Sequence, residues 1–169
     1  MSKVICPGSF NPVTKGHIDI FERCAHLFDS VIVLVVSNRD KRYGATAEQR
    51  VDWIRRATAH VANISADSYG GLLADYVRIV SADFIVKGVR NDLDLIGESQ
   101  MYYANRTLMP EGVDTLLMPT REQYIYLSSS LVRDIAAHGG SIDEFVPQCI
   151  VREVAQTYRT QTESGGSRT

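Results

Sequence analysis

The chain has 169 residues, of which 44% are hydrophobic and 22% are charged, and its formal net charge is −2. This size and composition are typical of one globular domain with a single substantial core. The small negative charge argues against broad nucleic-acid binding, which needs a strongly basic surface. The three cysteines show no Cys-x-x-Cys spacing, which argues against structural zinc and a disulfide framework.

The apolar segments suggest where the protein is found. The N-terminus leads directly into a short apolar segment, without a signal peptide. The longest apolar runs, such as residues 31–36, are far too short to span a bilayer. We therefore expect a cytoplasmic protein with no membrane partner.

Short apolar runs alternate along the chain with segments of helical periodicity, and turn residues separate them. Predicted strands cover residues 4–6, 31–36, 61–67, 83–88 and 113–118. Predicted helices cover residues 16–27, 46–58, 72–80, 94–108, 128–136 and 147–158. In the second helix, Thr46 and Gln49 match a capping box. The alternation predicts an α/β fold, a Rossmann-like doubly wound parallel sheet of five strands. We expect a single domain over residues 1–160 and a disordered tail at 161–169.

The loop after the first strand is the most informative stretch, Pro7-Gly8-Ser9-Phe10-Asn11-Pro12-Val13-Thr14-Lys15-Gly16-His17. It joins a buried strand to a helix, so unpaired backbone N–H groups and the positive helix end should face a crevice that suits phosphate. The spacing is neither that of a P-loop nor that of a dinucleotide-binding loop. An ordinary strand-to-helix turn with a capping or packing His17 is the structural alternative.

This loop resembles the Pro-Gly-Ser/Thr-Phe-Asp-Pro-x-Thr-x-Gly-His signature of the bacterial phosphopantetheine adenylyltransferase family. That family lies in the nucleotidyltransferase superfamily with His-x-Gly-His motifs. Thr14 occupies the place of the first histidine, as it does in the adenylyltransferases, whereas cytidylyltransferases keep histidine there. The resemblance extends from residue 3 to about residue 158.

Three later segments match the family at the same edge of the predicted sheet. Lys41 lies in a basic run that by itself favours a solvated surface, but the family has a phosphate-contacting lysine in this loop. Residues 87–90 read Lys-Gly-Val-Arg where the family reads Arg-Gly-Leu-Arg, so the charge is kept and the bidentate fork is lost. The serines 128–130, followed by Arg133, resemble the family's serine block; alone they would indicate a helix cap.

The resemblance implies reversible transfer of the adenylyl group of ATP to 4′-phosphopantetheine, with dephospho-coenzyme A and pyrophosphate as products. The implied catalytic residues are His17, Lys41 and Lys87. The implied ATP-binding residues are Ser9, Phe10, His17, Gly88, Val89, Arg90, Glu98, Tyr124, Ile125, Tyr126, Leu127, Ser128, Ser129 and Ser130. The implied 4′-phosphopantetheine-binding residues are Ser9, Lys41, Leu73 and Lys87. Mg²⁺ is the expected cofactor, with no protein residue assigned as its ligand, and a homohexamer and coenzyme A as an inhibitor are also implied.

Several residues depart from the family pattern. Asn11 replaces the usual aspartate, residues 95–97 read Leu-Ile-Gly in place of Phe-Glu-Tyr, and Tyr124 stands where tryptophan is common. These departures concern specificity and affinity, since no phosphate-binding group is lost. Two other functions stay open: transfer to another acceptor, such as nicotinamide mononucleotide or glycerol phosphate, and a non-catalytic nucleotide-binding domain.

Overall fold

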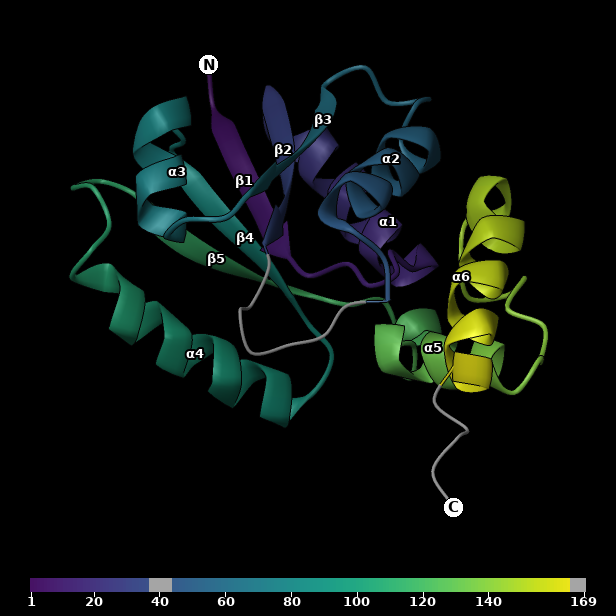
Figure 1. The fold of residues 1–169 in the computed structure, drawn as a ribbon. Coiled ribbons are helices and arrows are strands. Elements are labelled where there is room, and N and C mark those ends of the chain that lie inside the picture. Colours follow the sequence, from purple (N-terminus) through teal and green to yellow (C-terminus); the bar gives the residue numbers. More distant parts are fainter. Residues whose placement is uncertain (37–43, 165–169) are drawn as a thin grey trace.

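The computed structural model describes residues 1–36 and 44–164, with side chains up to residue 159. Five strands form one parallel sheet in the order β3-β2-β1-β4-β5 (Figure 1). The strands are β1 (Lys3–Gly8), β2 (Ser30–Val36), β3 (Ile64–Tyr69), β4 (Phe84–Val89) and β5 (Asp114–Pro119). The parallel five-stranded sheet predicted from the alternating pattern is confirmed.

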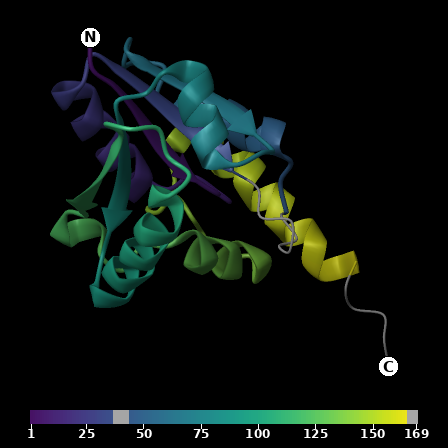
Figure 2. The same cartoon turned by 90° about the vertical axis from the view of Figure 1, so that its left-hand side faces the viewer.

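Helices cover both faces of the sheet, as predicted for a doubly wound fold. They are α1 (Lys15–Leu27), α2 (Ala47–Ala57), α3 (Leu73–Val80), α4 (Asp92–Arg106), α5 (Ser129–Ala137) and α6 (Val151–Ser164). Apolar side chains of α1, α2, α5 and α6 share one core cluster with alternate positions of β1 and β2. The opposite face forms a second cluster with α3. In Figure 1, α3 lies on one side of the strands and α1 and α2 lie on the other, and Figure 2 views the molecule from the side of α3 and α4.

The strand order explains where a ligand can enter. The chain passes from β1 outward to β2 and β3, and then returns to the other side of β1 as β4. Val4 pairs with Val31 of β2 and with Phe84 of β4, so β1 is central. The loops after β1 and β4 lead away in opposite directions, which opens a crevice at the carboxyl ends of these two strands.

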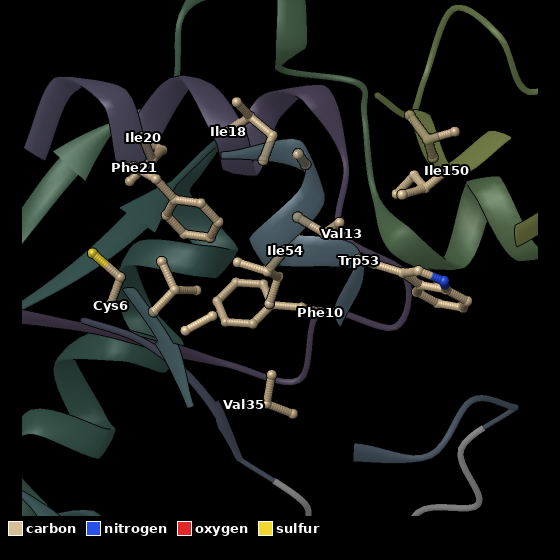
Figure 3. Packing of buried hydrophobic residues seen from close by; sticks show 14 of the residues in the cluster. Cys6, Phe10, Val13, Ile18, Ile20, Phe21, Val35, Trp53, Ile54 and Ile150 are labelled. Atoms are coloured by element: carbon tan, nitrogen blue, oxygen red, sulfur yellow. The ribbon is translucent and has the colours of Figure 1, made fainter. Parts of the chain in front are cut away.

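The loop after β1 is built into the larger core cluster. Phe10 and Val13 are buried with Phe21 of α1 and Ile54 of α2. Figure 3 shows Phe10 and Phe21 beside one another in this cluster, and their ring centroids are 5.3 Å apart. Because the loop contributes to the core on one side, its other side is held in a fixed position at the crevice.

The largest differences from the predicted element boundaries are at the third strand and the last helix. The third strand begins at Ile64 rather than at residue 61, because the Val61 amide donates to Thr58 O and closes the turn after α2. The last helix is preceded by a 3₁₀ turn, η2 (Gln148–Ile150), and extends beyond residue 158 to Ser164. A second 3₁₀ turn, η1 (Glu122–Tyr124), precedes α5.

One smaller prediction, a helix cap, is confirmed. Thr46 and Gln49 form the predicted capping box of α2. Cys6, Cys24 and Cys149 are free thiols, and the first two are buried. In the described part of the chain, none of the helices has the length and apolar character needed to cross a membrane.

Candidate active site

A cavity of about 730 Å³ lies at the carboxyl ends of β1 and β4. Its walls come from the loop after β1, the end of β4, the first turns of α4 and the segment from Thr120 to Arg133. The predicted site residues in this lining are Ser9, Phe10, His17, Lys87, Gly88, Arg90, Glu98, Tyr124, Leu127, Ser128, Ser129 and Ser130. Segments far apart in the sequence therefore meet at the position predicted from the strand ends.

His17 is fixed by the cap of α1. Thr14 is the N-cap, and its hydroxyl oxygen accepts a hydrogen bond from the His17 amide at 3.4 Å. In return the Thr14 amide donates to His17 Nδ1 at 3.0 Å. A backbone amide can only donate, so Nδ1 must accept and the neutral ring carries its proton on Nε2. His17 therefore does cap α1, which was the structural alternative to a functional role. The cap uses only Nδ1, so the Nε2–H group remains available as a donor.

The His17 ring is also held between aromatic side chains. The Phe10 ring meets it edge to face at 5.1 Å, and Phe21 stacks against it at 6.4 Å. Burial, and secondly the positive charge of Arg90, lower the pKa of His17 to about 4. The imidazole is therefore neutral at physiological pH, so it can offer a hydrogen bond but not a full positive charge.

Phe10 has a backbone conformation that few residues adopt. Its φ of 43° lies in the left-handed region, which costs about 1–2 kcal/mol for a residue with a side chain. A Cβ at Gly8 would lie 2.6 Å from the Phe10 ring, so the ring can take this position only because residue 8 is glycine. The strained loop is thus stabilised by the packing of Phe10, and the same packing holds His17.

Two cationic side chains reach the cavity from the end of β4 and the residue after it. Lys87 Nζ lies 3.2 Å from Glu98 Oε2 of α4. Arg90 donates to both oxygens of Asp94, at 2.8 and 3.0 Å, and to Leu127 O at 3.2 Å. The hydrogen bonds from Arg90 hold the pKa of Asp94 below its usual range, so this carboxylate stays ionised and keeps the guanidinium in place.

The first turn of α5 supplies hydroxyl groups and another cation. Ser128 is the N-cap, accepting from the Leu131 amide at 3.1 Å. Ser129 Oγ donates to Pro12 O at 2.8 Å, and Arg133 donates to Asn11 O at 2.5 Å and to Ser130 Oγ at 3.1 Å. These bonds join α5 to the loop after β1, so the two segments form one wall with the positive helix end at the cavity.

Some predicted residues lie outside this lining. Val89, Ile125 and Tyr126 do not border the cavity, and Tyr126 is 62% exposed. Leu73 packs against the core cluster under α3. Lys41 falls outside the described residues. Their assignments to substrates stay predictions.

The structure also adds residues that the sequence reasoning did not select. Asp94 and Thr120 line the cavity, and Asp94 orients Arg90. Asp94 lies in the first turn of α4, where the positive helix end favours a carboxylate. Arg90 precedes the N-cap Asn91, so helical spacing does not predict the pairing of Asp94 with Arg90. Thr120 directly follows a strand, but nothing in its local pattern distinguishes it from a turn residue.

Comparisons with known proteins identify the family of this chain. A family model described as cytidylyltransferase-like matches residues 5–135. A phosphopantetheine adenylyltransferase from Heliobacterium modesticaldum is 42% identical over 158 residues, which cover 94% of each chain. One from Corynebacterium efficiens is 43% identical over 160 residues, covering 94% of this chain and 99% of the relative. One from Synechocystis is 41% identical over 154 residues, or 91% and 96% of the two chains.

A solved structure supports the fold independently. A Vibrio parahaemolyticus protein, provisionally assigned as a nicotinate-nucleotide adenylyltransferase, superimposes with a TM-score of 0.69. The superimposed region covers 94% of this chain and 96% of the Vibrio chain. The two sequences are only 20% identical, so the likeness concerns the fold. Taken with the signature loop and the near full-length relatives, these matches show that the chain belongs to the cytidylyltransferase-like family and, within it, to the phosphopantetheine adenylyltransferases.

Proposed function

We propose that the chain catalyses reversible transfer of the adenylyl group of ATP to 4′-phosphopantetheine, giving dephospho-coenzyme A and pyrophosphate. The observation that carries this proposal is the cavity at the ends of β1 and β4. There a neutral, capped His17 lies near the positive start of α5 and the cations of β4. The curated relatives of this chain are named for the same activity.

The reaction needs positioning and charge stabilisation more than proton transfer. A phosphate oxygen of 4′-phosphopantetheine attacks the α-phosphorus of ATP, and the bond from that phosphorus to the bridging oxygen breaks. Its electron pair leaves with pyrophosphate. The nucleophile is already an anion, so no general base is required. His17 Nε2–H donates to an α-phosphate oxygen as charge develops there, which is stabilisation by a preorganised donor.

The other side chains hold the two substrates in line. Ser9 and Lys87 bind the phosphate of 4′-phosphopantetheine, together with Lys41 from the loop outside the described residues. Arg90 and the block from Tyr124 to Ser130 bind ATP. Because Glu98 holds Lys87 and Asp94 holds Arg90, both cations are preoriented before substrates bind.

Mg²⁺ fits this site as an ion that arrives with ATP. Asp94 and Glu98 line the cavity, but each is paired with a cation. Among the side chains of residues 1–36 and 44–159, no group of three His, Cys, Asp or Glu residues could hold a metal ion. Phosphate oxygens would therefore be the main ligands, as is usual for Mg²⁺. The ion would neutralise charge on the departing pyrophosphate.

We further propose that the chain self-associates, as the expected homohexamer requires. No residue of α4 is buried, and Leu93, Ile96 and Tyr103, at helical spacing on one face, are 80%, 54% and 70% exposed. An apolar face of this kind is typical of an interface between copies. Light scattering after size-exclusion chromatography tests this: Ile96→Asp should lower the mass, and a monomeric wild type would refute it.

Two further expectations concern regulation and location. Coenzyme A contains the whole dephospho-coenzyme A product, so we expect it to compete for the same cavity and inhibit. A cytoplasmic location stays a prediction from the sequence.

Pyrophosphate release tests the reaction. Purified protein is incubated with ATP, Mg²⁺ and one of three acceptors: 4′-phosphopantetheine, nicotinamide mononucleotide or glycerol phosphate. We expect release only with 4′-phosphopantetheine, and loss of release in His17→Ala. Release with another acceptor would keep adenylyl transfer but refute the substrate, and binding of ATP without release would refute the enzyme function.

A further inference from the structure

Asn11 has a side-chain amide that the structure leaves half satisfied. The residue is only 5% exposed and lines the cavity. Its Oδ1 accepts a hydrogen bond from the Tyr158 hydroxyl of α6 at 2.5 Å. Its Nδ2 donates to no atom of residues 1–36 and 44–159. It is also not one of the fully enclosed polar atoms without a partner in those residues, so it keeps some accessible surface. An amide NH₂ in such a place takes its partner from the cavity, either water or a group of a bound ligand.

The surroundings fix which end of the amide faces the cavity. A separation of 2.5 Å between Tyr158 and Asn11 is suited to an O–H···O bond and short for a bond to nitrogen. The positive guanidinium groups of Arg133 and Arg50 act electrostatically on the Tyr158 hydroxyl. Because positive charge attracts the amide oxygen and repels the NH₂ group, the Asn11 oxygen is favoured on the side that faces Tyr158. The NH₂ end is thereby directed away from α6 and towards the cavity.

The backbone around Asn11 lies against the start of α5. Arg133 donates to Asn11 O, and Ser129 donates to Pro12 O. The NH₂ group therefore opens beside the segment to which we assign the phosphates of ATP. We propose that Asn11 Nδ2 binds the phosphate chain of ATP and that Tyr158 is a positioning residue that orients the amide. This inference rests on the proposed function of the cavity as an ATP site.

The amide changes the charge of the site relative to a carboxylate. An aspartate at residue 11 would keep the acceptor for Tyr158 but would direct a negative oxygen at the phosphates. Asparagine instead offers a donor to an anion, a bond stronger than one between neutral groups. The difference should be largest for metal-free ATP, whose phosphate charge no cation neutralises. This dependence on Mg²⁺ separates a phosphate contact from a merely structural role.

Calorimetric titration of ATP into the full chain, once with EDTA and once with excess Mg²⁺, tests the inference. For Asn11→Asp we expect Kd to rise about tenfold in EDTA and clearly less with Mg²⁺. For Tyr158→Phe we expect a rise of about threefold in both, with kcat unchanged. Asn105→Asp adds the same charge on α4 outside the lining and should leave Kd unchanged.

Equal ATP affinity of Asn11→Asp and the wild type would overturn the inference, as would weakened binding of 4′-phosphopantetheine alone. A second measurement needs no variant: the Asn11 NH₂ resonances of the wild type should shift on addition of ATP, and unchanged resonances would overturn the inference. Apart from the kcat of Tyr158→Phe, neither the calorimetry nor the resonance measurement requires turnover. A protein that binds ATP through Asn11 but releases no pyrophosphate would refute the proposed function alone.

Discussion

The two nitrogens of His17 can be tested separately with a pair of substitutions. Asparagine places an oxygen where Nδ1 lies, so His17→Asn keeps the acceptor for the Thr14 amide and removes the Nε2 donor. Glutamine places an NH₂ near Nε2, so His17→Gln keeps a donor and removes that acceptor. Loss of one preorganised donor typically lowers kcat by about 10²–10³-fold, or about 2.7–4 kcal/mol. Loss of a capping bond costs about 0.5–2 kcal/mol of stability.

We therefore expect opposite effects from the two variants. His17→Asn should lose turnover by about 10²–10³-fold and retain most of its stability, whereas His17→Gln should lose less turnover and about 0.5–2 kcal/mol of stability. Initial rates of pyrophosphate release at saturating substrates measure the first effect, and urea unfolding measures the second. If His17→Asn were the more active variant, the assigned tautomer and the role of Nε2 would both be wrong.

Three further outcomes follow from the same geometry. The pKa of His17 is about 4 in the folded chain against an ordinary 6.5, so between these pH values the unfolded chain binds one more proton than the folded chain. The free energy of unfolding should therefore fall by up to about 1.4 kcal/mol per pH unit as the pH drops through this window. Urea unfolding of His17→Asn should lack that contribution. Asp94→Asn should raise KM for ATP several-fold with little change in kcat, since Arg90 loses its bidentate partner, as steady-state kinetics would measure. Gly8→Ala should destabilise the fold by about 1–3 kcal/mol because its Cβ meets the Phe10 ring at 2.6 Å, and a thermal melt without a lower Tm would contradict this.

Local patterns predicted the fold because each strand and helix follows from its own residues. The β-branched run of β2 is buried by helices on both faces, and Thr46 caps α2 as its spacing predicts. The third strand had the weakest apolar pattern, and its start was the least accurately predicted of the strand starts. Val61 is apolar but belongs to a turn, in which the Asn63 side chain donates to the carbonyl oxygens of Ala25 and Phe28 before β2. Such tertiary bonds override local preference.

The sequence predicted that the candidate site lies at the ends of the strands, but it did not predict which side chains of the site bond to one another. The family signature located His17, and the strand pattern located Lys87 and Arg90, because the carboxyl ends of parallel strands meet at one edge. The bond from Tyr158 to Asn11 joins residues far apart in sequence, and no local spacing predicts it. For His17, the sequence offered capping and function as alternatives. In the structure Nδ1 takes part in the cap and the Nε2–H group stays available as a donor, so the two roles do not exclude one another.

The cations around the cavity differ in how much charge they can offer a phosphate. Lys87 and Arg90 each share their charge with a carboxylate, which preorients them but weakens their attraction for an anion. Arg133 is held by neutral groups, and no carboxylate of the described residues lies within ion-pair distance of it. Its charge therefore acts on the phosphates with less internal compensation. Together with a neutral His17 and the proposed donor at Asn11, this would concentrate the attraction for the ATP of the proposed reaction at the wall formed by the loop after β1 and the start of α5.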